Sequence, residues 1–246
     1  MGTFNEFLKL ERENPRIGIV GGLGPETGFL FALNLNNRIV DATNQQPDIL
    51  VNNVPMSKEL DERLINGEAA QETLSILTES ISTLNKADVD FIVIPCNSVH
   101  VFIDSLRRFS EKPVISIIEE CAKECKRRKI KRAGLLASST TVNEKLHEKE
   151  LSKLGIRTVL PNKNEQEEIS KVIIRILRNK AVDSDKIFLS GVIEGMAKDG
   201  AEAVILGCTD LQLLVKDSSL PIIDTLKVLE DSTVNTFLKL DKEVDY

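Results

Sequence analysis

The chain has 246 residues, a net charge of −6, and 41% apolar and 28% charged residues, an ordinary composition for a globular protein of one large or two average domains. The negative charge argues against a nucleic-acid partner, which usually requires a basic face. No apolar stretch approaches the roughly 18 residues of a membrane span, and the N-terminus lacks the pattern of a signal peptide. We therefore expect a cytoplasmic protein with no membrane partner.

A glycine-rich loop follows the first predicted strand. Residues 16–20, R-I-G-I-V, run into residues 21–28, G-G-L-G-P-E-T-G. The dinucleotide fingerprint G-x-G-x-x-G fails here because Thr27 stands at its last glycine, and the next strand ends in Asn52 rather than in an acidic ribose ligand. The free N–H groups of the loop and of the helix start still suit a carboxylate or another small anion.

The next elements alternate between helix and strand. A long amphipathic segment, residues 59–86, is predicted to be helical with a break near residues 66–67. The apolar run at residues 114–118, V-I-S-I-I, is predicted to be a strand that leads into a helix. Cys121 and Cys125 lie four residues apart on that helix, so they share one face and are expected to pack in the core.

Two segments end a short apolar run in a cysteine. Residues 91–100 are F-I-V-I-P-C-N-S-V-H, and residues 203–212 are A-V-I-L-G-C-T-D-L-Q. A β-branched run that stops at cysteine predicts a buried parallel strand that presents a thiol at its carboxyl edge, where ligands bind in open α/β sheets. The alternative is that Cys96 and Cys208 are ordinary buried cysteines. Four cysteines without a C-x-x-C pair, and only two histidines, predict no metal site.

The second half of the chain repeats the pattern of the first half. Four blocks recur in order at a nearly constant spacing, at residues 132–141, 155–162, 201–209 and 220–226. The repeat predicts an α/β fold of two similar domains, each a parallel sheet flanked by helices, related by a pseudo-two-fold axis. We expect one domain at residues 1–112 and 222–246, where the closing helix returns, the other at residues 113–221, and the active site in the cleft between them.

Two opposed thiols permit a specific reaction without a cofactor. A thiolate at Cys96 or Cys208 can remove the α-proton of an amino acid while the thiol on the other face returns a proton, which inverts the stereocentre. Both cysteines precede predicted helices, whose dipoles favour the thiolate. Backbone N–H groups of the glycine loop and of residues 138–141 are expected to hold the substrate carboxylate.

These motifs resemble the aspartate/glutamate racemase superfamily. The resemblance rests on P-C-N-S-V-H at residues 95–100, on G-C-T-D at residues 207–210 and on I-G-I-V-G-G-L-G-P-E-T at residues 17–27, and it extends over nearly the whole chain. It implies a cofactor-independent amino-acid racemase, usually a homodimer, with Cys96 and Cys208 as its acid/base pair. Asp210, where glutamate racemases have His, indicates the aspartate branch, so the expected substrate is aspartate or glutamate.

The resemblance also implies a set of substrate contacts. Asn97, Ser98 and Thr209 follow the two cysteines, and the other positions match further family motifs. The expected substrate-binding residues are Gly22, Thr27, Asn52, Asn97, Ser98, Ser138, Thr141, Arg178 and Thr209.

One family motif is absent. The P-D-R-T-like segment that supplies an arginine for a side-chain carboxylate is replaced by V-P-M-S-K-E-L-D-E-R, which leaves Lys58, Arg63, Arg178 and Lys180 as candidates. His100 either orients the site or is a structural histidine, and His147, in a charged stretch, is expected at the surface.

Two other functions remain open on the sequence. The first keeps the scaffold but changes the reaction, to hydantoin racemisation or isomerisation of a diacid. The second is a nucleotide-binding oxidoreductase or a ligand-binding protein built on the glycine loop, which the imperfect fingerprint disfavours.

Overall fold

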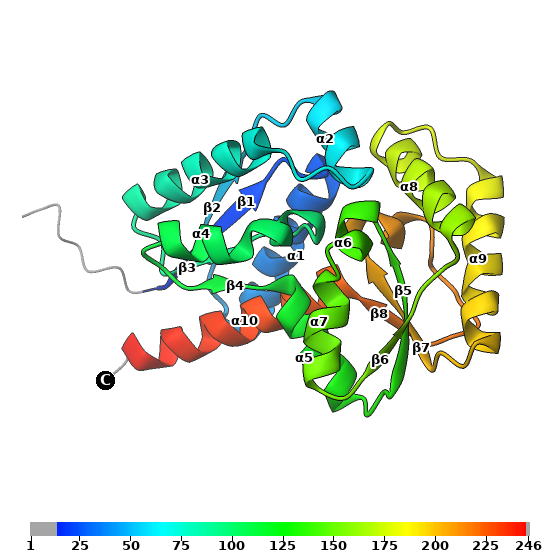
Figure 1. Cartoon of the computed structure of the whole chain (residues 1–246). Helices are drawn as coiled ribbons and strands as arrows, with labels where there is room; N and C mark the ends of the chain where they lie inside the picture. Colours follow the sequence, from blue (N-terminus) through cyan, green and yellow to red (C-terminus); the bar gives the residue numbers. More distant parts are fainter. Residues whose placement is uncertain (1–13, 245–246) are drawn as a thin grey trace, which may run out of the picture.

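Two four-stranded parallel sheets form the scaffold, one in each half of the chain (Figure 1). The structure is a computed structural model that describes residues 14–244. The first half comprises β1 (Arg16–Gly21), α1 (Pro25–Thr43), β2 (Asp48–Asn53), α2 (Lys58–Ile65), α3 (Gln71–Lys86), β3 (Phe91–Val93), the 3-10 helix η1 (Ser98–Phe102), α4 (Ile103–Phe109), β4 (Val114–Ile115) and α5 (Ile117–Arg127).

The second half repeats the four-strand pattern, but it has two helices between its first two strands and no α-helix between its last two strands. It comprises β5 (Arg132–Ala137), α6 (Ser139–Asn143), α7 (Leu146–Lys153), β6 (Arg157–Val159), α8 (Lys163–Leu177), α9 (Asp183–Lys198), β7 (Ala203–Gly207), the 3-10 helix η2 (Thr209–Leu213), β8 (Ile222–Asp224) and α10 (Thr225–Val244). The strand orders are β2-β1-β3-β4 and β6-β5-β7-β8, with every pair parallel. The predicted α/β fold with an internal duplication is confirmed.

The sheet pairing corrects the predicted domain boundaries. Residues 114–115 form β4, which pairs with β3 of the first sheet, and β8 pairs with β7 of the second sheet. Each half therefore ends one strand later than the sequence predicted. The run V-I-S-I-I is also not one strand, because Ser116 accepts a hydrogen bond from the Glu119 N–H and begins α5 at Ile117.

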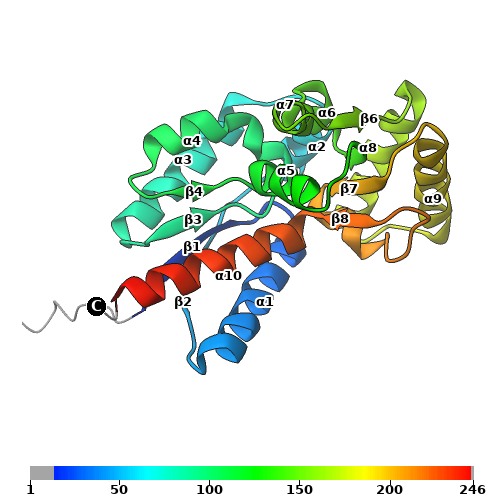
Figure 2. The same ribbon diagram turned by 90° about the horizontal axis from the view of Figure 1, so that it is seen from below.

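The closing helix α10 returns to the first half, as expected. It runs from β8 back along α1 (Figure 2). Its residues Leu226, Leu229 and Phe237 pack in the core formed by β1 and α1. The last helix of the second half therefore belongs to the hydrophobic core of the first half. Among residues 14–244, no helix is long and apolar enough to cross a membrane.

The predicted break in the long amphipathic segment is confirmed. Helix α2 ends before Gly67, whose φ of 109° lies in the left-handed region, and α3 begins at Gln71. The break frees α2 to leave its own half: Ile65 packs in the core of the second half, against residues that include Ile169 and Leu211. Cys121 and Cys125 are both buried in one cluster, as predicted.

Candidate active site

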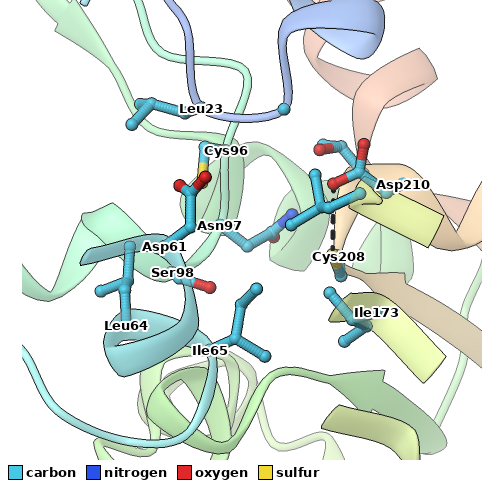
Figure 3. A pocket seen from close by; sticks show the side chains of 13 residues that line it. Leu23, Asp61, Leu64, Ile65, Cys96, Asn97, Ser98, Ile173, Cys208 and Asp210 are labelled. Atoms are coloured by element: carbon cyan, nitrogen blue, oxygen red, sulfur yellow. Dashed lines mark hydrogen bonds between the residues drawn. The ribbon is translucent and has the colours of Figure 1, made fainter. Parts of the chain in front are cut away.

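Cys96 and Cys208 occupy equivalent places in the two halves. Cys96 lies three residues beyond the end of β3, and Cys208 follows β7 directly. The helices behind them begin as short 3-10 turns, η1 and η2, rather than as the regular helices expected from the sequence. The two side chains lie on opposite sides of one cavity (Figure 3). The duplication therefore brings the two thiols to a shared space between the halves.

The cavity is small, and its lining comes from both halves. Its volume is about 30 Å³, room for one or two water molecules. Five predicted site residues line it: Cys96, Asn97, Ser98, Cys208 and Thr209. The other lining residues are Leu23, Gly24, Asp61, Leu64, Ile65, Ile173, Leu177 and Asp210.

His100 holds the backbone of Cys96. The Ile117 N–H donates to its Nε2 at 3.3 Å, which leaves Nδ1 protonated to donate to the Cys96 carbonyl at 2.7 Å. Burial lowers the pKa of His100 to about 4, so the ring is neutral at physiological pH. The side chain does not line the cavity, so of the two roles left open by the sequence, the structural one fits.

Asn97 is fixed by a buried chain of hydrogen bonds that links both halves. Its Nδ2 donates to Thr225 Oγ1 at 3.0 Å, and Thr225 donates to the carbonyl of Leu206, two residues before Cys208. Asn97 Oδ1 therefore accepts from His147 Nε2 at 2.9 Å. His147 is fully buried, so its predicted surface position is wrong. The flanking charges of α7 point outward while this one side chain packs inward.

Three hydroxyl groups join the halves on the other side of Asn97. Ser98 Oγ lies 2.7 Å from Ser138 Oγ and 3.4 Å from Thr141 Oγ1, and Ser138 also caps α6 by accepting from the Thr141 N–H. Only Ser98 of the three lines the cavity. Ser138 and Thr141, predicted as substrate contacts, reach the site through Ser98.

Asp210, in η2 of the second half, contacts the start of α1 in the first half. Thr27 Oγ1 donates to its Oδ1 at 2.5 Å, and Cys208 Sγ donates to its Oδ2 at 3.9 Å. Gly24, with a φ of 92°, lies so close that a Cβ there would come within 3.0 Å of the carboxylate. Burial raises the pKa of Asp210 to about 6, and the bonds from Thr27 and Cys208 oppose that rise.

Helix α2 covers the cavity from the first half. Its residues Asp61, Leu64 and Ile65 line the space, and Asp61 points towards Cys96 (Figure 3). Two residues of the second half bind it: Thr140 Oγ1 donates to the Leu64 carbonyl, and Arg178 binds Glu62 and the backbone of Lys58. Arg178 Nη2 donates to Glu62 Oε1 at 3.1 Å and to the Lys58 carbonyl at 2.9 Å.

Burial dominates the acidity of both thiols. It raises the pKa of Cys96 to about 12 and that of Cys208 well above its usual value. The Asp210 carboxylate raises both further, whereas backbone N–H groups of η1 and η2 oppose the rise. The expectation that helix dipoles favour the thiolate is therefore outweighed by burial.

The remaining predicted contacts lie outside the cavity. Gly22 has a φ of 85° and packs against the backbone of Val54, and Asn52 accepts a hydrogen bond from Ser80. Thr27 reaches the site only through Asp210. None of the four basic candidates lines the cavity: Lys58, Arg63, Arg178 and Lys180.

The sequence does not predict two carboxylates that line the cavity, Asp61 and Asp210. Asp61 is not predicted at the site, because its pattern on an amphipathic helix is that of a solvated charge. Asp210 was noted as part of a motif, but not as a site residue. Among residues 14–244 no group of three or more His, Cys, Asp or Glu side chains is arranged to hold a metal ion.

Two duplicated parallel α/β halves that each deliver one cysteine to a common cavity define the class of the aspartate/glutamate racemases. The profile of the family described as Asp/Glu/Hydantoin racemase matches residues 20–232, most of the chain. The chain belongs to this family and is accordingly a racemase, an enzyme of the isomerase class.

Individual relatives agree with this assignment. The broad specificity amino-acid racemase RacX of Bacillus subtilis (strain 168) is 26% identical over 229 residues, covering 90% of this chain and 98% of that protein. An aspartate racemase homologue from Pyrococcus horikoshii OT3 has a TM-score of 0.70 at 25% identity, covering 92% of this chain and 99% of that one. A putative Asp/Glu racemase from Yersinia pestis has a TM-score of 0.79 at 21% identity, covering 91% and 99%.

Proposed function

We propose that the protein is a cofactor-independent amino-acid racemase in which Cys96 and Cys208 act as the two bases. The observation that carries the proposal is the placement of two thiols, from equivalent strands of a duplicated fold, on opposite sides of one cavity. A substrate α-carbon between them exposes one face to each sulfur. That geometry suits removal of a proton from one face and its replacement on the other.

Each turnover conserves protons and charge. The thiolate on one side takes the α-proton and becomes a thiol, and the two electrons of the broken C–H bond stay on the α-carbon. The thiol on the other side then gives its proton to that carbon and becomes the thiolate. The next substrate of opposite configuration meets the enzyme in the complementary state, so the reaction runs in both directions.

The substrate itself helps to form the thiolate. Burial and the carboxylate of Asp210 raise the pKa of both thiols in the closed cavity. An α-ammonium group that enters the cavity adds a positive charge close to the sulfurs, which lowers the pKa of each thiol. Substrate binding therefore favours loss of one thiol proton to solvent, which leaves the thiolate–thiol pair that turnover requires.

The polar residues on the cavity wall are the proposed contacts of the substrate backbone. Asn97, Ser98 and Thr209 line the space beside the thiols. Hydrogen bonds to other groups fix the first two, and Thr209 Oγ1 donates to the Pro95 carbonyl at 3.3 Å. Preoriented groups of this kind stabilise developing charge on the substrate carboxylate at little reorganisation cost.

The admission of a substrate requires the cavity to widen, because an amino acid is several times larger than the water-sized space present. Helix α2 covers this space and is joined to the second half by few polar contacts. We propose that α2 moves to admit the substrate. Closure then removes water from the thiols.

Two alternatives share the scaffold. Aspartate or glutamate is the substrate expected from the family, and the family description also includes hydantoin racemases.

A cytoplasmic location and a homodimer likewise remain proposals. The homodimer is supported by the apolar side chains of Phe29 and Leu33, each 57% exposed and four residues apart on one face of α1.

The proposal is tested by chiral chromatography of single L-amino acids incubated with the purified protein and with two variants, Cys96→Ser and Cys208→Ser. We expect the wild-type protein to form the D-enantiomer and each variant to lose at least about 100-fold in kcat. The reason is that a serine hydroxyl does not ionise near neutral pH, and the neutral hydroxyl is a far weaker base than a thiolate. Cys121→Ser, at a buried cysteine outside the cavity, is the matched control. Racemisation that persists in either site variant would exclude the two-thiol mechanism.

A further inference from the structure

The charges that face the cavity are negative. Asp61 and Asp210 line it from opposite halves, and none of the lining residues is Lys, Arg or His. A substrate with a carboxylate side chain would bring a further negative charge among these groups, with no cation to receive it. Like charges in a partly desolvated space repel strongly. The cavity is therefore poorly suited to aspartate or glutamate.

The basic residues near the site are engaged elsewhere. Arg178 is the nearest candidate, but its guanidinium is bound by Glu62 and by the Lys58 carbonyl. Arg63 is paired with Glu68, and Lys58 and Lys180 are exposed to solvent. A carboxylate in the cavity would have to take Arg178 away from Glu62, which would leave that carboxylate without its partner.

Asp61 and Asp210 differ in what they can offer a ligand. Asp210 is occupied by Thr27 and Cys208 and lies almost completely out of solvent. Asp61 accepts no hydrogen bond from any residue between 14 and 244. Its carboxylate points into the cavity (Figure 3). It is the one lining carboxylate that is free to bind a cation.

The surroundings of Asp61 disfavour its ionised form. Burial raises its pKa to about 6, Arg178 opposes that rise, and the carboxylates of Asp210 and Glu62 add to it. A positive group beside Asp61 would stabilise the ionised carboxylate and lower its pKa. The apolar side chains of Leu64, Ile65 and Leu177 border the same space and suit an aliphatic stem.

We propose that Asp61 receives the cationic end of the substrate side chain, so that the enzyme prefers amino acids with an ammonium or guanidinium group, such as lysine, ornithine or arginine, to aspartate and glutamate. This proposal rests on the proposed function and specifies its substrate class. A second cation in the cavity also lowers the pKa of the thiols beyond the effect of the α-ammonium group. Substrate choice and thiolate formation then depend on the same charges.

The test compares kcat and KM for L-lysine, its uncharged analogue L-norleucine, and L-aspartate. For the wild-type enzyme we expect kcat/KM for lysine to exceed that for aspartate by at least about tenfold. Asp61→Asn should lower kcat/KM for lysine by at least about tenfold, mainly through KM, and leave norleucine within about threefold. Glu59→Gln removes one carboxylate from the exposed side of α2 and is the matched control, expected to leave all three substrates unchanged.

The contrary outcomes are distinct. A wild-type preference for aspartate overturns the proposed side-chain specificity. An equal loss with lysine and norleucine in Asp61→Asn also overturns it, because it would show that Asp61 binds the α-ammonium group common to both. In either case the two-thiol racemase survives. If none of the amino acids is racemised, the proposed function fails and the substrate assignment fails with it.

Discussion

Asp210 carries a charge in surroundings that disfavour it. Its side chain is 5% exposed, and its pKa of about 6 lies well above the ordinary value of 3.8. An unfolded chain ionises this group near pH 4, whereas the folded protein holds the proton until about pH 6. The free energy of unfolding therefore decreases as the pH rises between these two values, and the decrease is complete above them.

We predict that Asp210→Asn stabilises the protein at pH 8. Asparagine keeps an oxygen to accept from Thr27 but has no charge to desolvate. A shift of about two pKa units corresponds to about 3 kcal/mol, the upper bound of the gain. Urea unfolding at several pH values checks this: the variant should have the higher midpoint at pH 8, and the difference should shrink towards pH 4. A lower midpoint for the variant at pH 8 would show that Asp210 stabilises the fold.

The proposed reacting residues were more predictable from the sequence than their surroundings. Cys96 and Cys208 could be predicted because each ends an apolar run and because the chain repeats that run. Asp61 and His147 could not, since each lies among charged neighbours on a short helix, where the pattern is that of a solvated face. Which of those side chains turns inward depends on how α2 and α7 pack against the other half, and a single sequence does not record that.

Helix α2 is one of several parts of the first half that the second half holds directly. Thr140 on α6 donates a hydrogen bond to the Leu64 carbonyl, and Ile65 packs among residues of α8 and η2. Within the first half, Leu64 packs in the core and Ser57 caps the start of α2. The polar contacts between α2 and the second half are few, and Thr140 supplies one of them.

We predict that Thr140→Val weakens closure of α2. Valine has the shape of threonine but cannot donate, so the Leu64 carbonyl loses its partner at a cost of about 1–3 kcal/mol in the closed state. KM should rise by about fivefold or more, with a smaller effect on kcat, in steady-state racemisation assays. Thr140→Ser, which keeps the hydroxyl group, is the control. A KM unchanged by the valine substitution would show that this contact does not control closure.

The regular elements were largely predictable, and their ends were not. The helical break at Gly67 and the eight strands follow from local patterns. The division of V-I-S-I-I into β4 and α5 depends on the Ser116 cap, and the pairing of β4 with the first sheet depends on contacts distant in sequence. The domain boundary was misplaced by one strand for that reason.

The exposed apolar face of α1 supports the proposed homodimer. We predict that Leu33→Glu shifts the protein from dimer to monomer in sedimentation experiments, because a buried carboxylate without a partner disfavours association. Ile187→Glu, at an exposed side chain on α9, is the control and should leave the oligomeric state unchanged. A wild-type protein that is monomeric at micromolar concentration would contradict the proposal.

Each half places one thiol at the cavity, and we propose that these two thiols act on opposite faces of one carbon. The most direct measurement is the fate of the α-hydrogen when an L-amino acid from the substrate panel is racemised in D₂O and stopped at low conversion. The two-thiol account predicts that the D-product carries deuterium at the α-carbon, supplied by the opposite thiol, while the remaining L-substrate keeps its hydrogen. Deuterium in the recovered L-substrate at the rate of product formation, or a D-product that retains the original hydrogen, would indicate a single base and contradict the account.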